Sequence, residues 1–364
     1  MEIRRTPFEA GTKLELMEGD KAISRVLVFD LRMNIGGVWA RCGGIGGVET
    51  SRDHRMHGCG RRLLEESIIW MRQEGYHLSA LFGIPNFYYR FGYAPGLVES
   101  EATVVTRQAE TAPRRYAVRE FAPEDAPAVA DLYMQQNARR TGMIARNRET
   151  WQGIRRGASW VERVAAFVVT DEEQVVGYAS YNIDPWRYAI GEVGYRDWSV
   201  FGTLLAEMGR RAVEARVERV SLALPGDEPF LAYCRRYGLE QKLTYPYYAN
   251  GMVRVVDQAA LLELLKPVLE ERLTAAGIAR QSSAVGGTLV VETELGTDRV
   301  ALGQGGPEWR VRLSQALLGQ LVMGYRGVED ALFETDAQVD EQVVPVLQAL
   351  FPRGYPYIYC SDRF

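Results

Sequence analysis

The alternation of apolar and polar positions divides the first hundred residues into strands, one helix and a further strand. Strand character is found at Lys13 to Leu16, Arg25 to Arg32 and Gly37 to Val48, with glycine-rich turns between these segments. From Gly60 to Arg72 the apolar residues recur at helical spacing, and Gly75 ends the pattern. A short strand at Leu78 to Phe82 follows, so this part of the chain predicts a mixed unit of strands and helix.

The same order of elements returns after a charged linker at Arg107 to Arg115. The predicted elements are a strand at Tyr116 to Glu120, a helix at Pro123 to Asn137, strands at Ala165 to Thr170 and Gln174 to Asn182, a helix near Val200 to Ala215 and a strand at Arg219 to Leu224. In addition, the segment FYYRFGY at Phe87 to Tyr93 aligns without gaps with YCRRYGL at Tyr233 to Leu239. These repeats indicate a duplication.

A third pattern occupies the last part of the chain. It consists of an amphipathic helix at Asp257 to Ala276, alternating residues at Gly287 to Glu294 and Val300 to Leu302, and helices near Ser314 to Met323 and Asp340 to Leu350. A chain of 364 residues is too long for one ordinary core. We therefore predict three domains, at residues 1–108, 109–253 and 254–364, and an α+β (mixed α/β) fold class.

The amino-acid composition indicates which broad class of protein this is. Hydrophobic residues make up 47% of the chain and charged residues 25%, which is typical of a soluble globular protein. No apolar run approaches the roughly 20 residues that cross a bilayer, and the N-terminal residues lack the apolar segment of a secretory signal. The net charge of −4 gives no long-range attraction for nucleic acid. We therefore expect a cytoplasmic protein with neither a membrane nor a nucleic-acid partner.

The cysteines and histidines do not suggest a metal site. Cys42, Cys59, Cys234 and Cys360 are far apart and form no CxxC pair, so neither a zinc site nor a disulfide framework is predicted. His54 and His57 lie close together, but no third ligand accompanies them. No metal cofactor is expected.

A glycine-rich loop supplies the first candidate chemistry. Arg55-Met56-His57-Gly58-Cys59-Gly60 lies beyond the strand that ends near Thr50 and opens the predicted helix. Backbone amides at a helix start bind a diphosphate well, because they donate hydrogen bonds and the helix dipole favours an anion. The glycines let the ligand approach the backbone, and Arg55 and Arg61 add positive charge. The bare RxxGxG pattern is weakly specific, and an ordinary turn is the alternative.

A second motif about thirty residues later makes the RxxGxG loop a more specific signal of function. Val48 to Gly60 resembles the acetyl-CoA motif of the GNAT superfamily of N-acetyltransferases, and Asn86 to Pro95 resembles its FYxRFGY segment. The whole layout resembles the enhanced-intracellular-survival (Eis) family of aminoglycoside and lysine acetyltransferases. This resemblance implies tandem GNAT folds, each a mixed central sheet flanked by helices, followed by a sterol-carrier-like α+β domain.

The resemblance also implies roles for individual residues, with acetyl-CoA as the co-substrate. The loop backbone would bind the CoA pyrophosphate, and the end of the preceding strand would pair with pantetheine. The residues expected to bind the cofactor are Val48, Glu49, Thr50, Arg55, Met56, His57, Gly58, Cys59, Gly60 and Arg61. Tyr88 would be the general acid, and the α-carboxylate of Phe364 would be the base.

Elementary acid–base chemistry agrees with the two catalytic roles. A phenol with a pKa of about 10 stays protonated at neutral pH and is able to donate to the departing thiolate. An α-carboxylate ordinarily has a pKa of roughly 3.5, so burial must raise it or a water molecule must relay the proton. Without the resemblance, Tyr88 would be interpreted as one member of an aromatic core cluster.

The second copy departs from both motifs. Tyr195 to Gly202 stands where the loop is expected but lacks RxxGxG, and Cys234 occupies the place of Tyr88. We expect this copy to be degenerate, forming one wall of the substrate cavity and placing the tail. The first copy also begins almost directly with a strand, without the helices that usually come first in GNAT folds.

The sequence therefore predicts an N-acetyltransferase that moves acetyl from acetyl-CoA to a primary amine by direct attack in a ternary complex. Aminoglycosides, polyamines and lysine side chains, including protein lysines, are the candidate acceptors. The alternative is a non-catalytic carrier, or a CoA-binding regulatory protein, whose C-terminal domain binds an apolar ligand. The resemblance further implies a homo-oligomer, often a hexamer.

Overall fold

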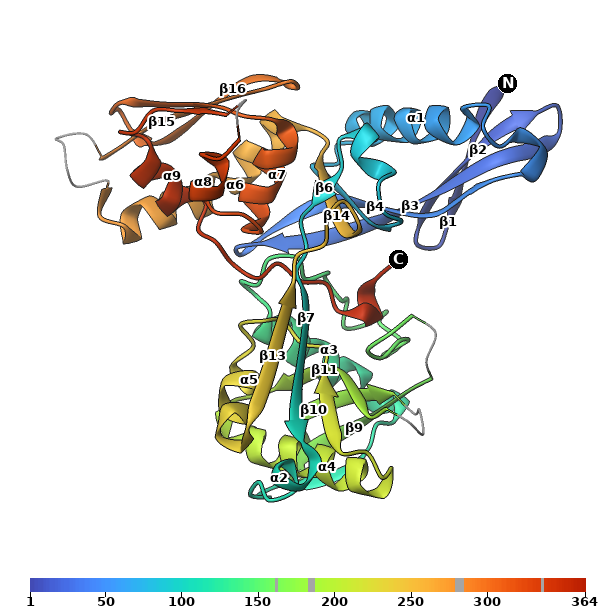
Figure 1. Ribbon diagram of the computed structural model, residues 1–364, viewed down its shortest axis with the longest axis vertical. Coiled ribbons are helices and arrows are strands. Elements are labelled where there is room, and N and C mark those ends of the chain that lie inside the picture. Colours follow the sequence, from blue (N-terminus) through green and yellow to red (C-terminus); the bar gives the residue numbers. More distant parts are fainter. Residues whose placement is uncertain (161–162, 183–186, 279–284, 335–336) are drawn as a thin grey trace.

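The computed structural model describes residues 1–160, 163–182, 187–278, 285–334 and 337–364. Three units meet near the middle of the molecule (Figure 1). The first contains a seven-stranded sheet, the second another seven-stranded sheet, and the third a four-stranded sheet with several helices. These mixed sheets flanked by helices confirm the predicted fold class.

The strands are β1 (Glu2–Phe8), β2 (Gly11–Glu18), β3 (Lys21–Ile35), β4 (Val38–Thr50), β5 (Leu78–Gly83), β6 (Ala94–Pro95), β7 (Glu99–Val105), β8 (Ala117–Glu120), β9 (Val164–Asp171), β10 (Gln174–Asn182), β11 (Ala189–Tyr195), β12 (Arg219–Leu222), β13 (Leu239–Thr244), β14 (Asn250–Val255), β15 (Val285–Thr293), β16 (Gly296–Gln304), β17 (Glu308–Arg312) and β18 (Gln338–Val339).

The α-helices are α1 (Cys59–Gln73), α2 (Thr106–Ala109), α3 (Ala126–Gln136), α4 (Phe201–Glu214), α5 (Pro229–Cys234), α6 (Gln258–Ala275), α7 (Gln315–Met323), α8 (Val328–Ala331) and α9 (Val344–Leu350). Short 3-10 helices are η1 (Arg52–His54), η2 (Tyr88–Phe91), η3 (Pro123–Asp125), η4 (Trp198–Val200), η5 (Arg235–Tyr237) and η7 (Cys360–Asp362).

The first sheet has the strand order β1-β2-β3-β4-β5-β14-β6. The first fifty residues contribute four antiparallel strands, and β4 then pairs with β5 in parallel, which requires the crossover that α1 supplies. Helix α1 buries Leu63, Leu64 and Met71 against one face of this sheet and exposes its charged residues. The chain leaves the helix at Gly75, whose φ of 78° favours glycine.

The second sheet repeats this order, as β8-β9-β10-β11-β12-β7-β13. Again one neighbouring pair is parallel, here β11 with β12, and helix α4 makes the crossover. The aligned motifs end in a similar way, because the C-cap of η2 is Gly92 with a φ of 75° and the C-cap of η5 is Gly238 with a φ of 76°. The duplication inferred from the sequence is thus visible in the topology.

The two sheets exchange one strand. The sixth position of the first sheet is filled by β14, which follows the second repeat in sequence and pairs with both β5 and β6. The sixth position of the second sheet is filled by β7, which follows the first repeat and pairs with β12 and β13. The predicted boundary at residues 253/254 falls inside β14 and the one at 108/109 falls shortly after β7; both boundaries stay a prediction.

The third unit packs against the first. Its sheet, in the order β16-β15-β17-β18, is covered by α6, and the apolar cluster between them continues to the first sheet. Met33 and Cys42 of the first sheet belong to the same cluster as Leu265 and Leu318 of the third unit. In the last stretch of chain, Tyr357 and Tyr359 join the core of the second unit, whereas Ile358 and Phe364 pack with the cluster of the first and third units. No helix among the described residues is long and apolar enough to cross a membrane.

Candidate functional site

The predicted phosphate loop forms the start of α1. No side chain caps the backbone amides there. Gly58 is the N-cap of α1, with a φ of 78°, and no side-chain cap is present. Met56 also has a positive φ, of 63°, and its side chain is fully exposed. The Arg55 guanidinium turns back and donates from Nε to the Thr50 carbonyl over 3.2 Å. A fifteen-residue helix with free first-turn amides and a neighbouring arginine fits an anionic ligand.

The end of β4 lies directly against this helix start. A Cβ built on Gly60 would lie 3.2 Å from Thr50 Oγ1, so the glycine allows close packing. Thr50 also hydrogen-bonds to Ser24 of β3, with 2.9 Å between the hydroxyl oxygens. Beside the loop is a cavity of about 690 Å³. Its lining includes Val48, Glu49, Thr50 and Arg55 but neither Tyr88 nor Phe364.

The two histidines differ in their surroundings. His54 hydrogen-bonds to Ser51 over 2.9 Å and to Glu18 over 3.1 Å, whereas the His57 side chain is exposed. Cys59 is buried in the first core. Among the described residues, no group of three or more His, Cys, Asp or Glu side chains is arranged to hold a metal ion.

Strands β4 and β5 separate beside the loop. Their parallel register ends at Ile45 and Leu81, whereas β4 continues to Thr50 by pairing with β3 alone. A bulge between Arg25 and Leu27 of β3 lies opposite this part of β4, where Gly47 adopts a φ of 56°. One backbone edge of residues 46–50 is therefore left without a strand partner among the described residues. Such an edge accepts an extended ligand through main-chain hydrogen bonds.

The C-terminal residue enters this separation. A Cβ built on Gly46 would lie 3.3 Å from the carboxyl carbon of Phe364, and one on Gly44 would lie 2.7 Å from its ring. The ring packs near Phe29 and Phe82, with centroid distances of 5.9 and 5.8 Å. Figure 1 shows the C-terminal end between the first and second units, on the side of the first sheet opposite α1. The last carboxyl group therefore lies against β4 where the parallel pairing stops.

Tyr88 lies on the β5 side of the same separation. It begins η2, and its ring is packed closely against the backbone of Gly83, the last residue of β5. Phe87 contacts the ring edge to face at a centroid distance of 4.9 Å. Burial raises the pKa of Tyr88 above its ordinary value, and no hydrogen bond joins its hydroxyl to another described residue. Tyr88 is thus a protonated donor that is not already engaged.

The tail that carries Phe364 is held by residues that sequence reasoning missed. Arg146 pairs with Asp362, with 2.8 Å between Nη2 and Oδ2, and also with Glu192 of β11. Arg363 pairs with Glu99 over 3.2 Å, and its backbone carbonyl accepts a hydrogen bond from Arg156. Neither arginine of the second unit belongs to a recognisable motif, so only the three-dimensional structure brings these residues to the tail.

The equivalent site of the second repeat differs from the α1 loop in its cap and its surroundings. Asp197 caps the helix start there by accepting from the Ser199 amide over 2.8 Å, which places a carboxylate where an anion would bind. The linker covers the same place, because a Cβ on Gly202 would lie 2.5 Å from the Pro113 carbonyl oxygen. Cys234, at the position equivalent to Tyr88, is completely buried in the second core. A cavity of about 500 Å³ remains beside this helix start, with Pro113, Ser199 and Gly202 in its lining, but the carboxylate cap makes the helix start unsuited to a pyrophosphate.

Substitution of Cys234 should change the stability of the protein but not its activity. We expect Cys234→Ala to lower the free energy of unfolding by about 1 kcal/mol, because it removes a buried sulfur and leaves a small void. Catalytic turnover should stay within about twofold of wild type, since the thiol is enclosed in the second core, away from the predicted site residues. Thermal denaturation and steady-state kinetics on one preparation check both points. A large loss of turnover in a stably folded variant would assign the second repeat a chemical role.

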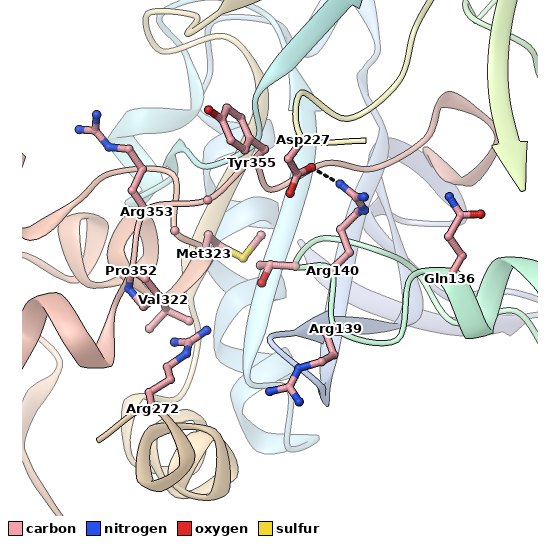
Figure 2. A pocket seen from close by; sticks show the side chains of 13 residues that line it. Gln136, Arg139, Arg140, Asp227, Arg272, Val322, Met323, Pro352, Arg353 and Tyr355 are labelled. Carbon is pink, nitrogen blue, oxygen red and sulfur yellow. Dashed lines mark hydrogen bonds and ion pairs between the residues drawn. The ribbon is translucent and has the colours of Figure 1, made fainter. Parts of the chain in front are cut away.

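A smaller cavity, of about 340 Å³, lies between the second and third units (Figure 2). It gathers Arg139, Arg140, Arg272 and Arg353, but three of these have carboxylate partners, so the positive charge is largely balanced. Figure 2 shows Arg140 directed at Asp227. None of the predicted site residues lines this cavity.

Comparison with known proteins agrees with the geometry. Residues 1–96 match the family model described as an acetyltransferase (GNAT) domain. The N-terminal unit is GNAT-like. A GNAT-like fold implies an acyl-CoA co-substrate and an amine-bearing acceptor, and it supports acyl transfer in general. No curated protein sequence matches this chain.

Solved structures resemble nearly the whole chain, not only its GNAT-like unit. A protein of Enterococcus faecalis V583, described as a probable N-acyltransferase, is 19% identical with a TM-score of 0.77, covering 98% of this chain and 89% of its own. A GCN5-related N-acetyltransferase of Kribbella flavida is 19% identical with a TM-score of 0.71, covering 97% and 87%. Eis1 of Mycobacterium abscessus is 16% identical with a TM-score of 0.66, covering 97% and 90%. At these identities the likeness shows the fold alone.

Proposed function

We propose that the protein transfers an acetyl group from acetyl-CoA to a primary amine by direct attack in a ternary complex. The observation that carries this proposal is the opening between β4 and β5. The Phe364 carboxyl group lies on one side of it and Tyr88 on the other, and the uncapped start of α1 lies just beyond. A pyrophosphate at α1 and a pantetheine along residues 46–50 would bring the thioester into this opening.

Each proton in the proposed reaction has a donor and an acceptor. The amine nitrogen attacks the thioester carbonyl carbon and forms the new C–N bond, and the amine proton passes to the Phe364 carboxylate directly or through a water molecule. The C–S bond then breaks, and the departing thiolate takes a proton from Tyr88. The products are an acetamide and free CoA, without a covalent enzyme intermediate.

Aminoglycosides, polyamines and lysine side chains remain the proposed acceptors. Beside the carboxylate, the Phe364 ring packs against Phe29 and Phe82, and Trp160 packs at 5.9 Å from Phe82. Arginine guanidinium groups already lie over two of these rings, Arg363 over Phe82 at 4.4 Å and Arg156 over Trp160 at 4.5 Å, so the aromatic contacts do not select among these amines. The sterol-carrier-like third unit, the homo-oligomer and the cytoplasmic location belong to the same proposal.

Release of free CoA thiol from acetyl-CoA tests the proposal. The assay compares tobramycin-like aminoglycosides, spermidine and a lysine peptide with a control that contains no amine. Faster thiol release with one of these amines, together with its acetylated product by mass spectrometry, is the expected result. Acetyl-CoA binding with no response to any amine would overturn the proposal in favour of a CoA-binding regulatory protein. Binding of an apolar probe without acetyl-CoA binding would favour a carrier.

The two ends of α1 provide a matched test of the loop. Gly58 and Gly75 both have a φ of 78°, and no neighbouring atom lies within 4 Å of a Cβ built on either. Valine therefore introduces similar backbone strain at both ends. We expect Gly58→Val to raise the KM for acetyl-CoA about tenfold or more by displacing the pyrophosphate amides, and Gly75→Val to leave it nearly unchanged. Equal KM values in the two variants would remove the loop from the cofactor site.

A further inference from the structure

A buried ion-pair network joins the second repeat to the tail. Arg146 makes a bidentate pair with Glu192, with 2.7 Å on each arm, and a second pair with Asp362 at 2.8 and 3.0 Å. The Arg146 and Glu192 side chains are 1% and 0% exposed, and that of Asp362 is 9% exposed. The arginine also lies over the Tyr133 ring at 3.7 Å. The network is therefore enclosed by protein on all sides.

The hydrogen bonds of Glu192 are complete. Its Oε1 accepts from Arg146 and from the Tyr178 hydroxyl at 2.5 Å, and its Oε2 accepts from Arg146 and from the Ser361 hydroxyl at 2.7 Å. Burial opposes its ionisation, but the charge of Arg146 and these hydrogen bonds lower the pKa of Glu192 below its usual value. A charged group this deep is tolerated because it is paired and fully hydrogen-bonded, so the loss of one partner destabilises the others.

The tail residues held by this network come immediately before Phe364. Ser361 and Asp362 are fixed to Arg146 and Glu192, and Arg363 is fixed by Glu99 and by Arg156. Upstream, Tyr357 and Tyr359 lie in the core of the second unit. Ile358 and the Arg363 guanidinium also contact the first unit, but the ion pairs of Asp362 and Arg363 are made with residues of the second unit, and Phe364 then reaches β4 of the first. The position of the terminal carboxylate therefore depends on contacts made in the other repeat.

We propose that Arg146, Glu192 and Asp362 are positioning residues, and that the second repeat has kept its fold in order to hold the terminal carboxylate at the acetyl-transfer site. This inference rests on the proposed function, in which that carboxylate accepts the amine proton. An error of about 1 Å in the position of a catalytic group lowers turnover by as much as about 100-fold. Loosening the network should therefore slow the reaction without touching a reacting atom.

The test begins with Asp362→Asn, which keeps the shape of the side chain and removes its charge. We expect kcat to fall about 10- to 100-fold while the KM for acetyl-CoA stays within about twofold. In a chain that already lacks Phe364, the same substitution should cause no further loss, because nothing remains to be positioned. The matched control is Arg148→Gln, which breaks the exposed pair of Arg148 with Asp131; neither kcat nor KM should change.

A second measurement does not depend on catalysis. Carboxypeptidase should release Phe364 slowly from the wild-type protein and at least about tenfold faster from Asp362→Asn, since a docked end resists proteolysis. If Asp362→Asn does not fold, Ser361→Ala removes only the hydroxyl contacts to Glu192 and Arg146 and should show the same effects more weakly. Intact mass spectrometry over time records the release.

The outcomes separate this inference from the proposed function. If wild-type protein transfers no acetyl group but the variants lose Phe364 faster, the network holds the tail and the proposed function is wrong. If transfer occurs and neither kcat nor Phe364 release changes in the variants, the positioning inference is wrong. Additive losses of kcat with the deletion of Phe364 would also overturn it, because they would show that the network acts on something other than the carboxylate.

Discussion

Replacing Tyr88 with phenylalanine lowers kcat for acetyl transfer by about 100-fold or more and leaves the KM for acetyl-CoA within about twofold of wild type. The phenyl ring keeps the packing against Gly83 and Phe87, so the variant loses only the proton donor. Steady-state kinetics with thiol detection measure both constants. Unchanged kcat would contradict the assignment of Tyr88 as the acid.

The control for this substitution is the next residue. Tyr89 belongs to the same 3-10 helix but is 43% exposed, and Tyr89→Phe should leave kcat unchanged. The pH dependence gives an independent check. Because burial raises the pKa of Tyr88 above its ordinary value, the protonated acid persists through neutral and mildly alkaline solution. Any decrease of kcat caused by its deprotonation should therefore occur only above about pH 10.

Deleting Phe364 should reduce kcat by about 100-fold or more, because the new terminal carboxylate, on Arg363, is one residue too far from β4. A C-terminal extension should have a similar effect, since it converts the carboxylate into an amide. Both changes leave the α1 loop intact, so the KM for acetyl-CoA should change little. Full activity in either variant would exclude the terminal carboxylate as the base.

Two further variants distinguish the carboxylate from the ring that accompanies it. Phe364→Ala keeps the terminal carboxylate and loses the contacts with Phe29 and Phe82, so its kcat should lie between those of wild type and the deletion. An N-terminal extension of the same length as the C-terminal one should leave kcat unchanged. If Phe364→Ala and the deletion were equally impaired, packing of the ring rather than the charge would be the important property.

Helices and turns that depend on neighbouring residues could be predicted from the sequence. The spacing of apolar residues located α1 to within a residue or two, because a single amphipathic face against one sheet leaves a clear period. The glycines at positions 58, 75 and 92 marked real changes of backbone direction, since all three adopt a positive φ. The alignment of the FYYRFGY segment with its partner likewise identified two equivalent turns.

Pairings between strands or side chains far apart in the sequence could not be predicted in this way. No strand was predicted from the sequence at β7 or β14, and even a clear period of two does not say which sheet a strand joins. Arg146 and Glu192 are forty-six residues apart and belong to no motif, so their pairing with Asp362 required the fold. Sequence analysis could place the tail near the site only through resemblance, whereas the contact between Phe364 and Gly46 gives it a physical basis.

The exchange of β7 and β14 sets the order in which this protein is able to fold during synthesis. A ribosome that has translated only the first repeat has produced β5 and β6 but not β14, the strand that lies between them. Until residues 250–255 emerge, β5 has an unpaired edge, which is a template for pairing with other nascent chains. Expression of residues 1–108 alone should therefore give aggregated protein, and appending residues 250–255 through a flexible linker should restore solubility.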